Sequence, residues 1–162
     1  MQAIEKPKPT ETMHKMFSVL LIDDDTDILT TLKHSLGQAG MHTFAFTNPM
    51  LAVEHFRRNA NSYDIVVTDI RMPHMSGFQV ARAVKQIRPD IKVAFATSFH
   101  INKPEFDKIF PSTEADAFIT KPVKPNMSTE ASSVLQHTLQ GLCYKVWKLE
   151  VEQRLLAWFY KR

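Results

Sequence analysis

The stretch Val19-Leu20-Leu21-Ile22-Asp23-Asp24-Asp25 decides the fold, because an unbroken apolar run ends abruptly in three carboxylates. Consecutive apolar residues are typical of a strand buried on both faces of a parallel sheet. Polar residues follow three further apolar runs in the same way: Asp69 after 65–67, Thr97-Ser98 after 93–96, and Lys121-Pro122 after 117–119. The carboxyl ends of neighbouring parallel strands face one crevice, so we expect these side chains to converge.

Five such strand segments alternate with helical patterns along the chain. The predicted strands are 17–22, 41–46, 65–68, 91–96 and 117–120. Helices are expected from a cap at Thr26 or Asp27, from Asn48-Pro49, and from Phe78 to the region of Arg88-Pro89, with a shorter one near 104–110. Parallel strands need helical crossovers, so the alternation predicts an α/β fold with a doubly wound, five-stranded parallel sheet and helices on both faces.

Composition places the chain among folded proteins that are expected to be cytoplasmic. It has 162 residues, 44% hydrophobic and 23% charged, with one cysteine, which excludes an intramolecular disulfide framework. Residues 1–16 are polar and predict a disordered leader rather than a signal peptide. No apolar run approaches the roughly 20 residues that cross a bilayer. The net charge of +3 is concentrated after Gly141, so nucleic-acid binding is not expected of the domain body.

The acidic residues at the predicted sheet edge favour a divalent cation. Asp23 and Asp24 leave one buried strand and Asp69 leaves another, so their repulsion without a cation would cost about a few kcal/mol per close pair. Oxygen ligands of this kind favour Mg²⁺ or Mn²⁺ over Zn²⁺. In the alternative interpretation the acidic run only caps a helix in a solvated loop, a role that suits Asp25 and Asp27.

A carboxylate near a fixed ammonium and a hydroxyl can also accept a phosphoryl group. Asp69 would attack phosphorus, while Lys121 and Thr97 would contact the phosphoryl oxygens. Each residue has an ordinary alternative: Asp69 as a turn residue, Lys121 as a surface charge and Thr97 as a strand-end cap. Their order at the ends of successive strands favours the chemical interpretation.

These motifs resemble the receiver domain of two-component response regulators over about residues 17–123. The resemblance is carried by Leu20-Leu21-Ile22-Asp23-Asp24-Asp25, by residues 64–73 with Met75 and Gly77, by Ala96-Thr97, and by Phe118-Ile119-Thr120-Lys121-Pro122. It implies a flavodoxin-like strand order, 2-1-3-4-5, and we place the receiver domain at 17–140. Apolar residues spaced three and four apart between Leu135 and Tyr160 predict a helix that runs on into an extension over 141–162.

The resemblance also implies a role for each site residue. Asp69 would take a phosphoryl group from a histidine kinase or phosphotransfer protein, and Lys121 and Thr97 would bind its oxygens. Asp24 and Asp69 would ligate Mg²⁺ directly, Asp23 through water, and Arg71 through its backbone carbonyl. Thr97 and Phe118 would form the switch that remodels the surface, with Phe118 in the place where the family often has tyrosine. A downstream protein would read that surface.

Other functions stay open at this point. A metal-dependent phosphohydrolase would use Asp23 as nucleophile with Asp25 two positions on, although it would leave the loop after Asp69 unexplained. We expect no turnover enzyme beyond slow autodephosphorylation, and no separate DNA-binding output domain. The basic, aromatic segment 141–162 admits a helix folded over the domain, a coiled coil that makes a homodimer, or an interfacial membrane helix, which Glu150 and Glu152 disfavour.

Overall fold

The computed structural model describes residues 16–38, 40–98, 108, 115–121 and 141 of the chain. Its strands are β1 (Ser18–Ile22), β2 (His42–Phe46), β3 (Ile65–Asp69), β4 (Lys92–Thr97) and β5 (Ala117–Thr120). The helices are α1 (Thr26–Gln38), α2 (Pro49–Asn59), the short 3-10 helix η1 (Ala60–Ser62) and α3 (Gly77–Ile87). All pairings are parallel and the order is β2-β1-β3-β4-β5, which confirms the predicted fold class.

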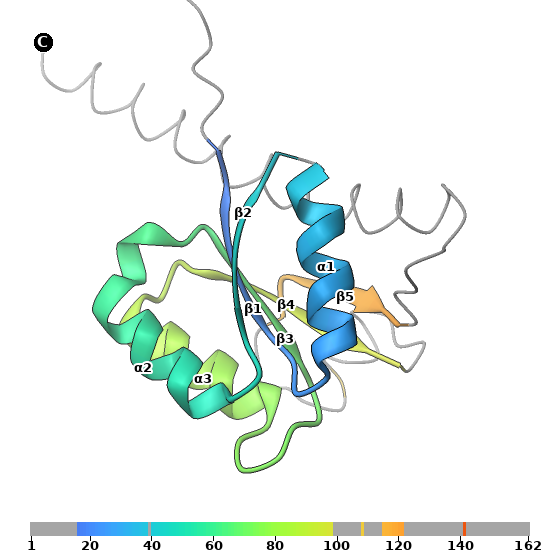
Figure 1. Cartoon of the computed structure of the whole chain (residues 1–162). Helices are drawn as coiled ribbons and strands as arrows, with labels where there is room; N and C mark the ends of the chain where they lie inside the picture. Colours follow the sequence, from blue (N-terminus) through green and yellow to red (C-terminus); the bar gives the residue numbers. More distant parts are fainter. Residues whose placement is uncertain (1–15, 39, 99–107, 109–114, 122–140, 142–162) are drawn as a thin grey trace, which may run out of the picture.

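Helices cover both faces of the sheet, with α1 on one side and α2 and α3 on the other (Figure 1). Successive side chains of a strand point to opposite faces, so each strand feeds two cores. Val19 and Leu21 pack toward α1, whereas Leu20 and Ile22 pack in the cluster that holds the buried residues of α2 and α3. This two-sided burial explains why β1 reads as a continuous apolar run in the sequence.

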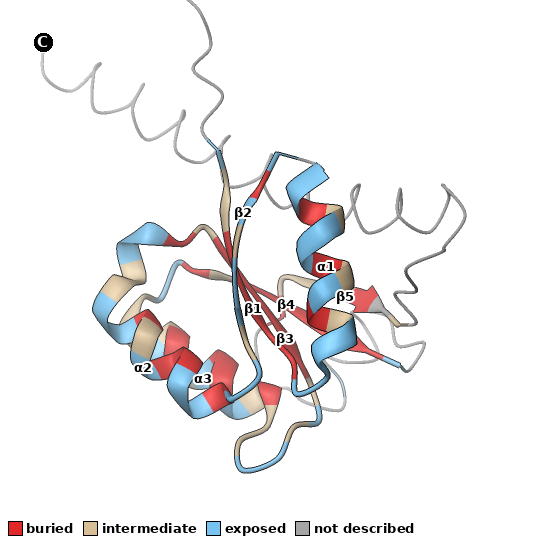
Figure 2. Cartoon of the chain, in the orientation of Figure 1, coloured by how far each residue is buried: buried red, intermediate tan, exposed pale blue. Residues whose placement is uncertain are grey.

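Burial is greatest in the middle of the sheet and falls toward its β2 edge (Figure 2). Every residue of β3 is buried, and β4 is buried after its first residue. In β2 the strand residues are exposed or half-buried, because β2 pairs only with β1 among the described strands. The strand that delivers Asp69 is therefore the most firmly enclosed one.

Side-chain caps fix the starts of α1, α2 and α3. Asp25, not Thr26 or Asp27, caps α1: its Oδ1 accepts the N–H groups of Asp27 and Ile28 at 2.9 and 3.3 Å. Asn48 caps α2 as predicted, and Ser76 caps α3 in a reciprocal box with Gln79. The prediction that named Thr26 or Asp27 was wrong, whereas the capping role that also suited Asp25 is confirmed, because the Asp25 carboxylate reaches the free N–H groups of the first turn.

Several predictions fall on residues outside the described ranges. These are the leader, the short helix near 104–110 apart from Lys108, and the extension with its alternatives of coiled coil and membrane helix. The domain boundaries at 16/17 and 140/141 therefore stay predictions. Within the part of the chain that is described, no helix is both long and apolar enough to span a bilayer.

Candidate functional site

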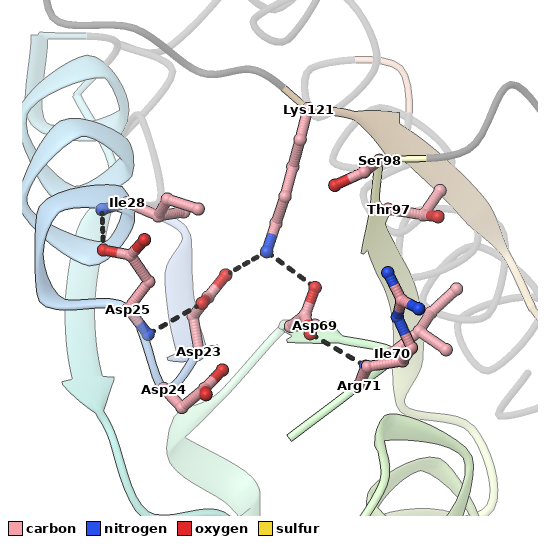
Figure 3. Close-up of a pocket in the computed structure, with 10 residues that line it drawn as sticks. All are labelled: Asp23, Asp24, Asp25, Ile28, Asp69, Ile70, Arg71, Thr97, Ser98 and Lys121. Atoms are coloured by element: carbon pink, nitrogen blue, oxygen red, sulfur yellow. Dashed lines mark hydrogen bonds and ion pairs between the residues drawn. The ribbon is translucent and has the colours of Figure 1, made fainter. Parts of the chain in front are cut away.

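The ends of β1, β3, β4 and β5 meet at one end of the sheet, which we call its carboxyl edge. Parallel register brings Asp69 beside Ala96 of β4, and Thr97 beside Thr120 of β5, so that Lys121 follows at the next position. A pocket of about 260 Å³ opens there (Figure 3). Its lining residues are Asp23, Asp24, Asp25, Ile28, Asp69, Ile70, Arg71, Thr97, Ser98 and Lys121. The predicted convergence of acids, hydroxyl and amine is thus present.

Lys121 bridges two carboxylates. Its Nζ lies 2.6 Å from Asp69 Oδ1 and 2.7 Å from Asp23 Oδ2, and the two dashed lines meet at its nitrogen in Figure 3. Burial acts to lower the pKa of Lys121, but its hydrogen bonds to Asp23 and Asp69 outweigh that effect and raise it. The side chain is therefore a fixed ammonium at neutral pH, directed at Asp69 from the far side of the pocket.

Asp23 is the most enclosed acid of the site, with 1% of its surface exposed. Its Oδ1 accepts the N–H of Asp25 at 3.0 Å. Its Oδ2 has no hydrogen-bond partner among the described residues beyond the ion pair with Lys121. Burial raises the pKa of Asp23 against the opposing effect of the Lys121 ammonium. This carboxylate is held charged at an energetic cost, which a further cation would reduce.

Asp69 is positioned by its backbone and left open on one side. Its Oδ2 accepts the N–H of Arg71 at 2.8 Å, while its Oδ1 meets the Lys121 ammonium. The side chain is 11% exposed and lines the pocket, so solvent and a small anion can reach it. Gly77 packs against the backbone here, since a Cβ at that position would overlap the carbonyl oxygen of Asp69. A glycine is thus required for the loop to close behind the carboxylate.

The donor set fits Mg²⁺, although no three acidic, histidine or cysteine groups among the described residues would hold a metal by themselves. Mg²⁺ usually keeps several waters and takes only one or two protein carboxylates. The exposed Asp24, the reachable Asp69 and the under-bonded buried oxygen of Asp23 supply oxygens of that kind. The roles predicted for these acids and for the Arg71 carbonyl stay predictions.

Thr97 and Phe118, the predicted switch pair, lie differently with respect to the pocket. Thr97 is buried and lines it, and its carbonyl accepts the N–H of Lys121 at 2.7 Å. Phe118 does not line the pocket; this side chain is half-buried against the cluster on the α2 and α3 side of the sheet and stacks on Phe95, with ring centroids 6.1 Å apart. A side chain that is only half-buried in this way can change its burial when its neighbours move.

Two lining residues were not singled out as site residues from the sequence. Ile28 lies in the first turn of α1 and Ile70 follows Asp69 directly. Ile28 was assigned only to the helical apolar pattern. Its place in the first turn was the available signal, because that turn begins at the carboxyl edge.

A family model described as the response regulator receiver domain matches residues 19–132. The chain belongs to the response regulator receiver family. It is 38% identical over 84 residues to the response regulator receiver protein CpdR of Brucella abortus, covering 52% of this chain and 68% of that protein. It is 29% identical to the chemotaxis protein CheV1 of Helicobacter pylori, covering 72% of this chain but only 38% of CheV1.

Solved structures share the fold of this chain. A receiver domain from Clostridium thermocellum superposes with a TM-score of 0.68 at 25% identity, covering 83% of this chain and 99% of that one. The CheX-CheY complex from Borrelia burgdorferi, which contains BeF3 and Mg²⁺, gives a TM-score of 0.63 at 22% identity, covering 76% and 87%. The family match makes this chain a receiver domain of two-component signalling, and such domains are signalling domains rather than typical turnover enzymes.

Proposed function

We propose that Asp69 accepts a phosphoryl group from a phosphohistidine of a histidine kinase or phosphotransfer protein. An Asp69 carboxylate oxygen forms the new bond to phosphorus as the bond from phosphorus to the histidine nitrogen breaks, and the imidazole leaves with the electron pair. The observation that carries this proposal is the 2.6 Å contact between the Lys121 ammonium and the carboxylate of Asp69 at the mouth of a polar pocket.

The surrounding residues are placed to support the transfer. Lys121 can turn from the carboxylate to a phosphoryl oxygen without leaving the pocket, because its ammonium already lies beside Asp69. Thr97, on the neighbouring strand end, can donate its hydroxyl to another phosphoryl oxygen. Asp24 and Asp69, with Asp23 and the Arg71 carbonyl nearby, would hold Mg²⁺, which would neutralise charge on those oxygens.

Phosphorylation would then change the surface through Thr97 and Phe118. Movement of Thr97 toward the phosphoryl group leaves space behind it, and Phe118 turns inward from its half-buried position on Phe95. A ligand of this kind biases two existing arrangements rather than creating a new one. A downstream protein reads the altered surface, and slow autodephosphorylation resets it.

The phosphohydrolase alternative receives less support from the geometry. It needs Asp25 as an acid or base beside a nucleophilic Asp23. The carboxylate of Asp25 is instead occupied as the cap of α1, and Asp23 is enclosed and paired with Lys121.

The proposal is tested by labelling with acetyl phosphate and Mg²⁺. We expect one label per wild-type chain and none in Asp69→Asn, with Asp25→Asn as the control that keeps labelling. Label retained in Asp69→Asn would overturn the assignment of the acceptor. Release of many phosphates per chain would favour the phosphohydrolase instead.

A further inference from the structure

Two aspartates at the opposite end of the sheet from the pocket, which we call its amino edge, make the same hydrogen-bonded ring. Each stands directly before a strand. The N–H of Asp116 donates to the Val93 carbonyl at 2.9 Å, and the N–H of Val93 donates back to Asp116 Oδ2 at 2.9 Å. Asp64 makes the equivalent pair with Ser18, with both distances again 2.9 Å. The side chain thus replaces a backbone acceptor and starts the ladder at a defined residue.

Each ring stands the same number of residues before a reacting group of the site. Asp64 comes five positions before Asp69 on β3, and Asp116 comes five positions before Lys121 on β5. β3 and β5 lie on either side of β4 (Figure 1). The two rings therefore set the register of β3 and of β5, and with it which residue of each segment stands at the carboxyl edge.

The register of β5 needs such a device. It has four residues and pairs only with β4 among the described strands. Phe118 packs toward one core and Ile119 belongs to the other, so the apolar pattern alone specifies the register weakly. A slip of one residue would move Lys121 by about 3.3 Å and send its side chain to the other face of the sheet. The 2.6 Å contact with Asp69 would then be lost.

We infer that Asp116 is a positioning residue for the phosphoryl-transfer site, acting through the register of β5 on Lys121. Its partly buried charge is offset by Lys92 Nζ, 3.2 Å from Oδ1, and by Lys85 Nζ of α3, 3.4 Å from Oδ2. Asp116 thereby ties α3, β4 and β5 together. The functional consequence rests on the roles proposed for Asp69 and Lys121.

The test compares Asp116→Ala with Asp116→Asn in the full chain, by titrating beryllofluoride in the presence of Mg²⁺ and following amide chemical shifts. Asp116→Ala removes the acceptor of the Val93 N–H, and we expect affinity to fall by about tenfold or more, as for a reacting group displaced by an ångström. Asp116→Asn retains an acceptor oxygen without the charge, so it should bind nearly as the wild type does. Lys92→Ala, which leaves the ring intact, should also bind normally.

Hydrogen exchange at the Lys121 amide supplies a second measurement that does not depend on phosphoryl chemistry. This N–H bonds to the Thr97 carbonyl at 2.7 Å, so its protection relative to a core amide such as that of Val67 should fall in Asp116→Ala. Asn48→Ala, which loses the cap of α2, controls for stability and should leave this ratio unchanged. Should Asp116→Ala fail to fold, Asp116→Glu keeps the charge but displaces the acceptor, and is expected to weaken both readouts.

The outcomes separate the two proposals. Wild-type affinity and wild-type Lys121 protection in a folded Asp116→Ala or Asp116→Glu variant would overturn the positioning role. If the wild-type chain itself binds no beryllofluoride, the proposed function fails, and the exchange ratio alone decides whether Asp116 fixes the strand.

Discussion

The two ends of the sheet use aspartate in opposite ways. At the amino edge, Asp64 and Asp116 each accept a backbone N–H and donate their own, so their polar groups are satisfied. At the carboxyl edge, Asp23 and Asp69 share one ammonium, and one buried oxygen of Asp23 has no other partner among the described residues. The comparison teaches that hydrogen-bonded aspartates at the amino edge contribute stability, whereas the carboxyl edge keeps an excess of negative charge, which suits the cation and the phosphoryl group that we propose for it.

The largest expected effect comes from removing the shared ammonium. Lys121→Ala leaves two close carboxylates uncompensated, and we expect the free energy of unfolding to fall by about 3 kcal/mol, as for a broken buried ion pair. Mg²⁺ should restore part of that loss because it offsets the same charges. Urea unfolding in EDTA and in Mg²⁺ measures both effects. Equal free energies of unfolding for the variant and the wild type in EDTA would contradict the repulsion between carboxylates that we infer at this edge.

The next effect tests the loop behind the acceptor. Gly77→Ala brings a Cβ onto the Asp69 carbonyl oxygen, so the backbone of Asp69 must shift. We expect a loss of about 2 kcal/mol, typical of overpacking, together with slower labelling by acetyl phosphate. Gly37→Ala is the matched control, because nothing lies within 4 Å of the added Cβ. Alanine in α1 should raise the free energy of unfolding by about 0.5 kcal/mol or more. Similar behaviour of the two variants would contradict the close approach.

A pair of substitutions tests the contrast between the edges directly. Asp64→Ala should lower the free energy of unfolding by about 1.5 kcal/mol, because the Ser18 N–H loses its acceptor. Asp23→Asn should raise it at neutral pH, because burial holds the pKa of Asp23 above 3.8 and its ionised form is disfavoured. The stability that the protonated Asp23 contributes is fully present below pH 3.8 and is lost as the pH rises through the raised pKa. The difference in the free energy of unfolding between Asp23→Asn and the wild type should therefore vanish in acid. If both substitutions changed the free energy of unfolding in the same direction at neutral pH, the proposed difference between the two edges would be wrong.

The smallest effect concerns Tyr63, which precedes β3 at the amino edge. It is 2% exposed, its hydroxyl lies 2.7 Å from His55 Nε2, and burial raises its pKa above 10.0. The neutral phenol therefore contributes stability in full below about pH 10, and this contribution is lost as the pH rises through the folded pKa. Urea unfolding at pH 9 to about 11 should show a shallower decline in Tyr63→Phe than in the wild type. Parallel declines would show that the phenol does not titrate on unfolding.

Sequence patterns predicted the strands closely because both faces of the sheet are buried. The apolar runs gave β5 at its observed bounds and placed β1 and β2 within one residue at their starts. Strand four was predicted to end at Ala96, but the ladder continues to Thr97, since the Thr97 carbonyl accepts from Lys121. Hydrophobicity marks burial, whereas the last rung of a ladder depends on the neighbouring strand.

The site divides in the same manner. The acids, Thr97 and Lys121 could be predicted as one group because each follows a buried strand, and parallel strands end together. That Lys121 contacts Asp23 as closely as Asp69 could not be predicted, and neither could the choice of Asp25 over Thr26 and Asp27 as the cap of α1. Such contacts depend on side-chain reach and on which oxygen has already been used by the backbone.

The amino-acid sequence by itself determined the alternation of buried strands and helices and the chemical character of the pocket. The reason is that the apolar pattern and the residue types are properties of each short segment. Only the tertiary structure decided which aspartates have hydrogen-bond partners for their oxygens and which are buried beside another carboxylate. In the sequence, Asp64 and Asp116 are ordinary residues before strands. Their pairing with Ser18 and Val93 arises only when segments 46 and 23 positions apart, respectively, are brought together. Register between strands is a property of pairs, and one chain segment cannot specify it alone.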